Sequence, residues 1–287
     1  MATAIYQKIT LYLRMIKFSH SIFALPFAFT AAFIAASGVP ALRQVFWIGV
    51  AMIAARSAAM GLNRVIDRKI DRENPRTAKR EIPAGVIGVG EAVVFIAVSF
   101  GVMVYAAWQL NPLCFLLSPV AASVLVLYSY TKRFTWLSHF VLGLAISGGP
   151  IGAWIAVTGS FDPRSLLLGF GVIFWLAGFD VLYALQDIDF DRARGLYSIP
   201  GRFGVSRSLL LARLFHAIAY LLLLATGHAF GLGLGYWLGM LVVAGLFLYE
   251  HSLVKADDLS KLDMAFFNMN GYISLTVFIA TFADYLI

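Results

Sequence analysis

The sequence has very few charged residues for its length. Asp, Glu, Lys and Arg together make up 13% of the 287 residues, which is about half of the share that soluble domains usually carry. Hydrophobic residues make up 61%. This balance excludes an ordinary soluble globular protein and indicates a chain whose outer surface faces lipid.

Cysteine is almost absent: Cys114 stands alone, so a disulfide within the chain is excluded. Short segments of alternating apolar and polar residues, which are typical of membrane barrels, are also lacking. The sequence has instead a series of apolar runs of about twenty residues, the length that crosses a bilayer as a helix. The runs lie near residues 18–37, 44–66, 86–108, 113–131, 137–158, 165–187, 207–230, 233–252 and 267–287.

These runs predict an all-α integral membrane protein, with a single bundle of about nine transmembrane helices. The connections between the runs are short, so we expect one transmembrane domain over residues 1–287 and no soluble domain. The first run follows Lys8, Arg14 and Lys17, as in a signal sequence, but it is longer than the apolar part of a cleaved signal. We therefore expect it to remain as the first helix.

Acidic residues are scarcer than basic ones, with 15 Asp and Glu against 22 Lys and Arg. The basic residues gather before the first run and in every second connection after it, whereas the other connections contain only Arg43 and Arg164. Positive residues collect in cytoplasmic loops, so we expect the N-terminus and the basic loops to be cytoplasmic and the C-terminus to be outside. Since topology explains this distribution, we expect membrane lipid and no nucleic acid as a partner.

The few acids follow a spacing that occurs twice, and its first instance ends the second run. Positions i, i+4, i+7 and i+11 of a helix share one face. A continuous helix therefore aligns Arg56, Asn63, Asp67 and Asp71 in one polar stripe.

The second instance ends the sixth run, in "DVLYALQDIDFDRARG". Asp180, Asp187 and Asp191 repeat the spacing of the first stripe, on the same predicted side of the membrane. The second stripe ends four runs after the first, which hints at an internal pseudo-repeat. Asp189 lies off the stripe, and we expect it to be a solvated neighbour.

Carboxylates stacked one helical turn apart at a membrane boundary repel one another and lose hydration. One such acid is commonly an interfacial anchor or helix cap, but a duplicated set indicates a bound cation. Magnesium prefers oxygen ligands and commonly takes one or two carboxylates together with substrate phosphates. Two facing acidic stripes beside basic loops therefore predict a site for a magnesium–diphosphate complex.

The two motifs resemble those of a known family. N-x3-D-x3-D at residues 63–71, followed by "RENPRTAKREIPAG", resembles the first signature of the UbiA-type intramembrane prenyltransferases. "YALQDIDFD", followed by "SIPGRFG", resembles the second. The layout of nine runs matches this family over the whole chain. "KFSHSIFALPFAF" and "GLYSIPGRFG" are most similar to the bacterial 4-hydroxybenzoate polyprenyltransferase-like branch.

This resemblance implies an enzyme of the bacterial cytoplasmic (inner) membrane that serves ubiquinone or menaquinone synthesis. It implies magnesium-dependent transfer of a polyprenyl group from a prenyl diphosphate to an aromatic acid, 4-hydroxybenzoate or a dihydroxynaphthoate. The metal ligands implied in this chain are Asn63, Asp67, Asp71, Asp180, Asp187 and Asp191, and the catalytic set is Asp67, Asp71, Asp187 and Asp191.

The resemblance also assigns three bases to the diphosphate: Arg76, Arg80 and Lys132, the last of which follows Tyr128 in a Y-x3-K element. Arg56 is a candidate for the acceptor carboxylate or for the diphosphate, and the sequence leaves this choice open. The five histidines show no ligand spacing, so packed or interfacial roles are expected for them. Glu250 and Asp284 match neither motif.

Two alternative functions also use intramembrane acids. CDP-alcohol phosphotransferases carry D-G-x2-A-R before G-x3-D-x3-D, and neither stripe here is preceded by that arrangement. A cation transporter also needs paired acids within a bundle, but these tend to lie near the middle of the membrane. The basic loops beside both stripes suit an anionic ligand that carries a metal.

Overall fold

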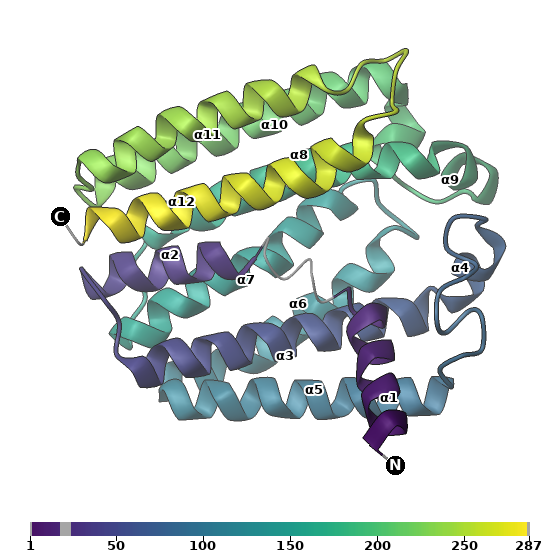
Figure 1. Cartoon of the computed structure of the whole chain (residues 1–287), viewed down its shortest axis with the longest axis horizontal. Helices are drawn as coiled ribbons and strands as arrows, with labels where there is room; N and C mark the ends of the chain where they lie inside the picture. The colour runs from purple at the N-terminus through teal and green to yellow at the C-terminus, as the bar shows by residue number, and fades with distance from the viewer. Residues whose placement is uncertain (1, 18–23, 286–287) are drawn as a thin grey trace.

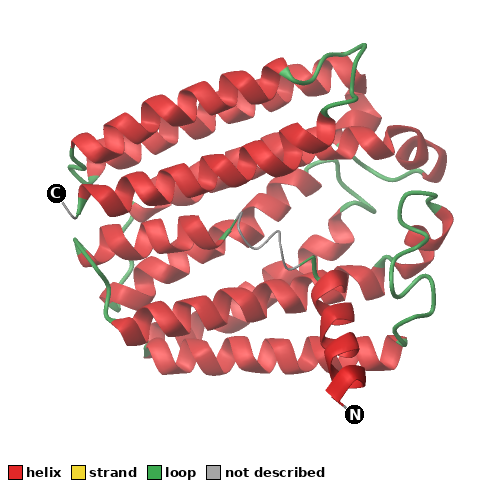
Figure 2. Cartoon of the chain, viewed as in Figure 1, coloured by secondary structure: helices red, strands yellow, loops and turns green. Residues whose placement is uncertain are grey.

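The computed structural model of the chain describes residues 2–17 and 24–285. Within these ranges the regular elements are all helical and no strand occurs (Figure 2). A short 3₁₀ turn (Leu185–Asp187) follows α8, and a π-helical segment (Met264–Met269) precedes α12. The α-helices are α1 (Ala2–Met15), α2 (Leu25–Ala36), α3 (Leu42–Ile66), α4 (Arg68–Glu73), α5 (Val89–Leu110), α6 (Pro112–Thr131), α7 (Ser138–Thr158), α8 (Ser165–Ala184), α9 (Ile188–Arg194), α10 (Ile199–Ala229), α11 (Leu234–Ser252) and α12 (Asn270–Asp284).

Seven helices are long and apolar enough to cross a membrane: α3, α5, α6, α7, α8 with its continuation to Arg194, α10 and α11. The expected first and last runs contain α2 and α12, which are shorter, at 12 and 15 residues. Parts of these two runs, 18–23 and 286–287, lie outside the described residues. The helical membrane fold is thus confirmed, and the count of nine crossing helices stays a prediction.

The long helices lie side by side and roughly parallel (Figure 1). α8 packs against α7 and α10, α3 packs against α5, and α2 packs between α7 and α12. Trp175 and Phe179 of α8 join Phe27 of α2 and Tyr236 of α11 in the main apolar core. The short helices α4 and α9 lie together at one end of the bundle, and the C-terminus lies at the other end.

Local sequence explains where several spans begin. The Asn111 side chain accepts from the backbone N–H of Cys114 at 2.9 Å, and Pro112 follows it at the first position of α6. Within α10, Gly204 has φ 78°, a left-handed value that glycine adopts without strain. The regular part of α10 therefore begins after Gly204, close to the expected start at residue 207.

Glu250 and Asp284, which match neither motif, have structural partners. Asp284 accepts from the backbone N–H of Gly233 at 2.5 Å and of Tyr236 at 3.4 Å, at the start of α11. It therefore supplies a carboxylate to the otherwise unpaired N–H groups of a helix N-terminus. Glu250 accepts from the Asn270 side chain at 2.8 Å in the packed interior. Neither acid lines the cavity between the two motifs.

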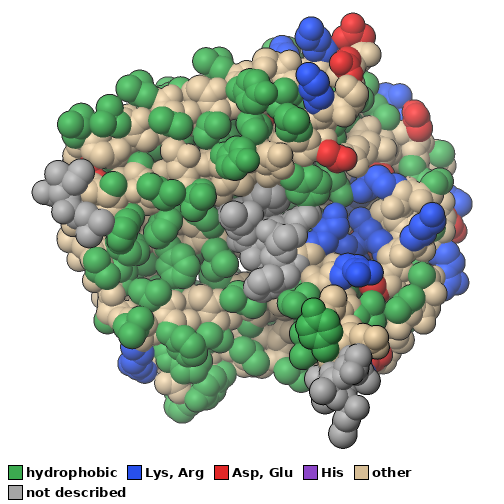
Figure 3. Space-filling view, viewed as in Figure 1, with side chains coloured by type: hydrophobic (Ala, Val, Ile, Leu, Met, Phe, Trp, Pro, Cys, Tyr) green, Lys and Arg blue, Asp and Glu red, His purple; other side chains and the backbone are tan. Residues whose placement is uncertain are grey.

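α1 differs from the long helices in its direction. It lies across them near the end that carries α4 and α9 (Figure 1). Met15 and Ile16, at its end, pack against Ile82, Ile87 and Ala92 of the α4–α5 connection and α5. Lys and Arg side chains gather at this same end of the bundle, while most of the face shown in Figure 3 is apolar.

This arrangement predicts the result of a labelling experiment. In a Cys114→Ser background, a membrane-impermeant thiol reagent is expected to label Lys79→Cys and Ala193→Cys only from the cytoplasmic side. It is expected to label Ser160→Cys, in the α7–α8 connection, only from outside. All three positions are exposed. The reverse pattern would show that the expected orientation is wrong.

Candidate functional site

Both acidic motifs lie where a helix is interrupted. α3 ends at Ile66, and Asp67, with φ −88° and ψ 3°, separates it from α4. Asp187, with φ −110° and ψ 8°, ends the 3₁₀ turn and separates it from α9. Both conformations lie in the bridge region, where many active-site residues are found. The expected continuous α-helix is therefore interrupted at Asp67 in the first motif and by the 3₁₀ turn in the second, although the acids of both motifs still line one cavity.

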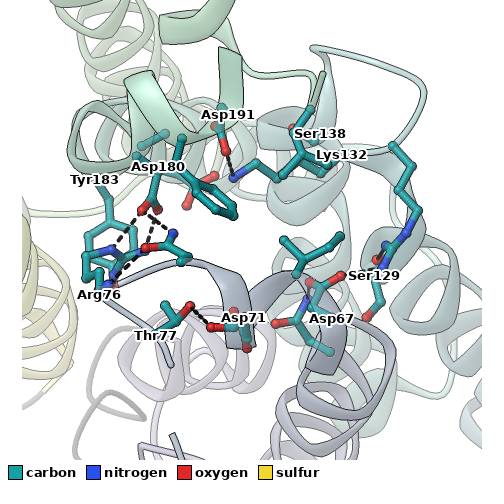
Figure 4. A pocket seen from close by; sticks show the side chains of 18 of the residues that line it. Asp67, Asp71, Arg76, Thr77, Ser129, Lys132, Ser138, Asp180, Tyr183 and Asp191 are labelled. Carbon is teal, nitrogen blue, oxygen red and sulfur yellow. Dashed lines mark hydrogen bonds and ion pairs between the residues drawn. The ribbon is translucent and has the colours of Figure 1, made fainter. Parts of the chain in front are cut away.

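A polar cavity of about 170 Å³ lies between the two motifs. Figure 4 shows Asp67 and Asp71 across this space from Lys132 and Asp191. The structure thus brings together all the predicted site residues except Arg56. The charged, amide and aromatic residues that line the cavity are Asn63, Asp67, Asp71, Asn74, Arg76, Arg80, Tyr128, Lys132, Arg133, His139, Asp180, Tyr183, Asp187, Phe190 and Asp191.

Both aspartates of the first motif are held by arginines. Arg133 donates to Asp67 at 2.7 Å, and the Asn63 amide donates to the other oxygen of Asp67 at 2.9 Å. Burial raises the pKa of the Asp67 carboxyl, while Arg133 opposes this increase. One nitrogen of Arg80 reaches both oxygens of Asp71, at 2.8 and 2.9 Å.

The second motif has the same kind of partners. Nε of Arg76 donates to Asp187 at 2.9 Å, and a second nitrogen of Arg76 contacts the other oxygen. Burial alone would lower the pKa of Arg76, but its bonds to Asp187 raise it above the ordinary value. The Asn74 amide donates to Asp187 at 2.9 Å. Lys132 pairs with the fully buried Asp191 at 2.8 Å.

Asp180 differs from the other acids because its partner is a histidine. Nδ1 of His139 lies 2.7 Å from Oδ2 of Asp180, and the backbone N–H of Ile199 donates to Nε2 at 3.2 Å. Nε2 must therefore be the acceptor, which leaves Nδ1 to carry the proton shared with Asp180. His139 thus links Asp180 to the start of α10.

The oxygen-rich acidic set fits a hard divalent cation such as magnesium. Within the described ranges, no three Asp, Glu, His or Cys side chains converge closely enough to hold one ion by themselves. An ion bound here would therefore take one or two carboxylates and complete its shell with phosphate or water oxygens. That is the usual way in which proteins bind magnesium with a phosphorylated substrate.

An apolar cavity of about 530 Å³ adjoins the polar one. Residues of α3, α5, α6, α7 and α8 line it, so it runs within the spanning part of the bundle. Asn63, Arg80, Tyr128, Asp180 and Tyr183 line both cavities, and we call these five residues the junction. Together the two cavities can hold a molecule with one charged end and a long hydrocarbon body.

Arg56 lines the apolar cavity and not the polar one. Within residues 2–17 and 24–285, its side chain forms one hydrogen bond, a long one of 3.5 Å to the backbone oxygen of Lys17. Its Nε is buried and has no partner in those ranges. Among the predicted bases, Arg56 therefore lines the apolar cavity alone, and it forms no ion pair within the described residues, whereas Arg76, Arg80 and Lys132 each do.

Several site residues were not singled out by the sequence. Arg133 was treated only as one of the basic loop residues that set topology. Its position next to Lys132, a predicted diphosphate ligand, could have indicated that it also lies near the acids. Asn74 belongs to the "RENPR" segment that follows the first motif. His139 could not be found by spacing, since its partner Asp180 is 41 residues away. Asp189 is exposed, as expected.

Comparison with known sequences identifies relatives that cover most of the chain. A sequence model described as the UbiA prenyltransferase family matches residues 24–272. A 4-hydroxybenzoate octaprenyltransferase of Aliivibrio fischeri is 32% identical over 257 residues, which are 90% of each chain. A protein of the same name from Pseudomonas aeruginosa is 33% identical over 256 residues, covering 88% of this chain and 84% of that one.

Solved structures agree with these matches. A UbiA homologue from Aeropyrum pernix K1, in an apo structure, is 31% identical, with a TM-score of 0.85 over 93% of this chain and 98% of that chain. One from Archaeoglobus fulgidus, bound to DMAPP and Mg²⁺, is 20% identical and shows the same fold, with a TM-score of 0.72 over 96% and 99%. The comparisons confirm the resemblance drawn from the two motifs and favour prenyl transfer over both alternative functions.

The ion pairs of the polar cavity predict a coupled effect on stability. Arg76→Met is expected to lower the thermal unfolding midpoint in detergent, because it leaves the buried Asp187 carboxylate without its cation. Asp187→Asn in the same chain should restore part of the loss, with a coupling free energy of about 1–3 kcal/mol in a double-mutant cycle.

The matched control for this cycle is the exposed pair of Arg194 and Glu73, whose side chains are 52% and 46% exposed. Arg194→Met with Glu73→Gln should show a coupling of at most about 1 kcal/mol. Equal coupling in the two pairs would show that burial in the cavity does not strengthen the contact between Arg76 and Asp187.

Proposed function

Because the chain belongs to the UbiA prenyltransferase family, we propose that it transfers a polyprenyl group from a prenyl diphosphate to an aromatic acid. The acceptor is 4-hydroxybenzoate or a dihydroxynaphthoate, and the reaction requires magnesium. The observation that carries this proposal is the junction between a cavity of paired acids and bases and a long apolar cavity. The names of the curated relatives support the choice of an aromatic acid acceptor.

The acids of both motifs are the proposed metal ligands. Asn63, Asp67 and Asp71 supply oxygens from one side of the polar cavity, and Asp187 and Asp191 supply them from the other. Asp180, oriented by His139, adds a further carboxylate at the junction. Bound magnesium would stabilise the negative charge that develops on the departing diphosphate.

The proposed diphosphate ligands, Arg76, Arg80 and Lys132, each hold one of these acids. When a metal–diphosphate complex binds, the acids of these pairs would hold the metal and the bases would hold the phosphate oxygens. Each charged group then exchanges one partner of opposite charge for another. Every charged group in the cavity thus keeps a partner of opposite charge. A buried charge without such a partner would cost on the order of several kcal/mol.

The junction is the place where the bond to the diphosphate would break. When the C–O bond breaks, its electron pair leaves with the diphosphate, and the basic side chains stabilise the increasing negative charge. An electron-rich ring carbon of the phenol then attacks the allylic carbon, and that ring carbon releases its proton to the departed diphosphate, which restores the aromatic ring. The rings of Tyr128 and Tyr183 line the junction, where their faces can stabilise positive charge. The surrounding apolar cavity keeps water from the allylic cation.

The position of Arg56 favours the acceptor over the diphosphate as its ligand. The side chain lines only the apolar cavity, and it has a buried nitrogen without a partner among the described residues. An aromatic carboxylate placed against this guanidinium would receive two parallel hydrogen bonds. The phenol end of the acceptor would then point towards the junction.

The metal proposal predicts that turnover needs four aspartates. Asp67→Ala, Asp71→Ala, Asp187→Ala and Asp191→Ala should each reduce turnover at least about 100-fold while the protein still inserts and folds, because the metal loses a carboxylate ligand. EDTA should abolish turnover of the unmodified protein, and added Mg²⁺ should restore it. Asp189→Ala, which removes an exposed acid of the same segment, should leave turnover unchanged. Full activity in EDTA would contradict the metal proposal.

The acceptor proposal predicts a change in substrate preference. Arg56→Ala should raise the KM for the aromatic acid, because the carboxylate loses its donor. It should also reduce the preference for that acid over the matching phenol without a carboxylate, by about 10-fold or more. Steady-state kinetics with each substrate varied in turn measures both effects. An unchanged acid-over-phenol preference would assign Arg56 to the diphosphate.

A further inference from the structure

Resting on the proposed function, we propose that Asn270, held by Glu250, is a positioning residue that acts on the junction through the ring of Phe267. Asn270 is the first residue of α12, and Glu250 lies near the end of α11. Both residues are 0% exposed, and neither lines the polar or the apolar cavity. Polar groups buried inside a membrane bundle cost free energy and commonly mark functional positions.

The Asn270 amide forms two hydrogen bonds at the place where the π-helical segment ends. Its nitrogen donates to Oε1 of Glu250 at 2.8 Å and to the backbone oxygen of Ala265, which lies inside the segment, at 3.1 Å. π-helical turns are rare and are frequently found at functional sites. One amide therefore joins α11 to the irregular turn that precedes α12.

Glu250 lies next to a histidine that is bonded to α8. Its Oε2 is 3.6 Å from Nδ1 of His216 in α10, and Nε2 of His216 donates to the backbone oxygen of Trp175 in α8 at 3.1 Å. The His216 ring lies directly against α8, because a side chain at Gly178 would collide with it. The position of Asn270 is thus set relative to α8, the helix that leads into the second motif.

The π-helical segment packs against the end of α8, next to the second motif. Ala265 belongs to the same buried apolar cluster as Leu182 and Leu185. Asp263, which directly precedes the segment, accepts from the side chain of Gln186 at 2.9 Å. The segment therefore supports the part of α8 and its 3₁₀ turn from which the acids of the second motif enter the polar cavity.

Phe267 is the residue of the segment that contacts the junction. Its ring lies edge-on to that of Tyr183, with ring centres 6.4 Å apart and planes at 77°, a favourable arrangement for two aromatic rings. Tyr183 lines both cavities, and its hydroxyl accepts from Arg76 at 2.6 Å. A shift of the π-helical segment would therefore move a ring proposed to face the allylic cation, together with a proposed diphosphate ligand.

Steady-state kinetics of the full-length protein in detergent test this proposal. Asn270→Leu keeps the size of the side chain and removes the amide. It should lower kcat about 10- to 100-fold, because a small displacement of the reacting groups is enough for such a loss. The KM for the aromatic acid should stay within about two-fold, since its proposed ligand, Arg56, belongs to α3. Glu250→Gln keeps the acceptor oxygen and should retain kcat within several-fold, whereas Glu250→Leu should lower it as Asn270→Leu does.

Asp284→Ala is the matched control, because Asp284 joins α11 and α12 at their opposite ends. It should lower the thermal unfolding midpoint and leave kcat unchanged. A second control places Asn270→Leu in a Phe267→Leu chain, where it should lower kcat no further if the amide acts through Phe267. An unchanged kcat in Asn270→Leu, an equal loss in Asp284→Ala, or additive losses in the double variant would each overturn the positioning role.

Hydrogen exchange, measured by mass spectrometry, gives a readout that needs no turnover. Asn270→Leu should speed backbone exchange in residues 183–195, and Asp284→Ala should not, because only the first change frees the π-helical segment. Unaltered exchange there in a folded Asn270 variant would overturn the proposal. Should Asn270→Leu fail to fold, as judged by its thermal unfolding, Asn270→Ala takes its place. If the unmodified protein transfers no prenyl group, the proposed function fails, while the exchange result still decides the role of Asn270.

Discussion

A carboxylate buried at the end of a membrane helix needs a cation beside it, and four aspartates of one cavity have such a partner here. The partners come from the connections that follow α4 and α6, so the pairs tie separate connections to the ends of the spans. Removing a base leaves a buried charge without compensation. The loops at this end of the bundle are thus held by the same groups that are proposed to bind the substrate.

The helix breaks make this pairing possible. The bridge conformation at Asp67 starts the short helix α4, and Asp187 starts α9 in the same way. Two segments far apart in the sequence therefore reach one cavity with the same local geometry, which agrees with the pseudo-repeat suggested by their spacing.

The sequence predicted the parts that depend on local pattern. Apolar runs of membrane length predicted the helices, and the duplicated spacing located both motifs. The break at Asp67 could not be predicted, because α4 resumes the helical period and preserves the apparent stripe. His139 was missed because its bond to Asp180 depends on how α7 and α8 pack.

The distribution of charge partners distinguishes the two ligands. The bases of the polar cavity are already paired with acids, so a bare diphosphate would have to compete with four carboxylates for them. A metal held by the carboxylates would remove this competition, so under the proposed roles the binding of diphosphate is coupled to the binding of metal. Arg56 faces no such competition, because no acid of the described residues pairs with it. Under the proposed roles, binding of the aromatic acid needs no exchange of partners and is independent of the metal.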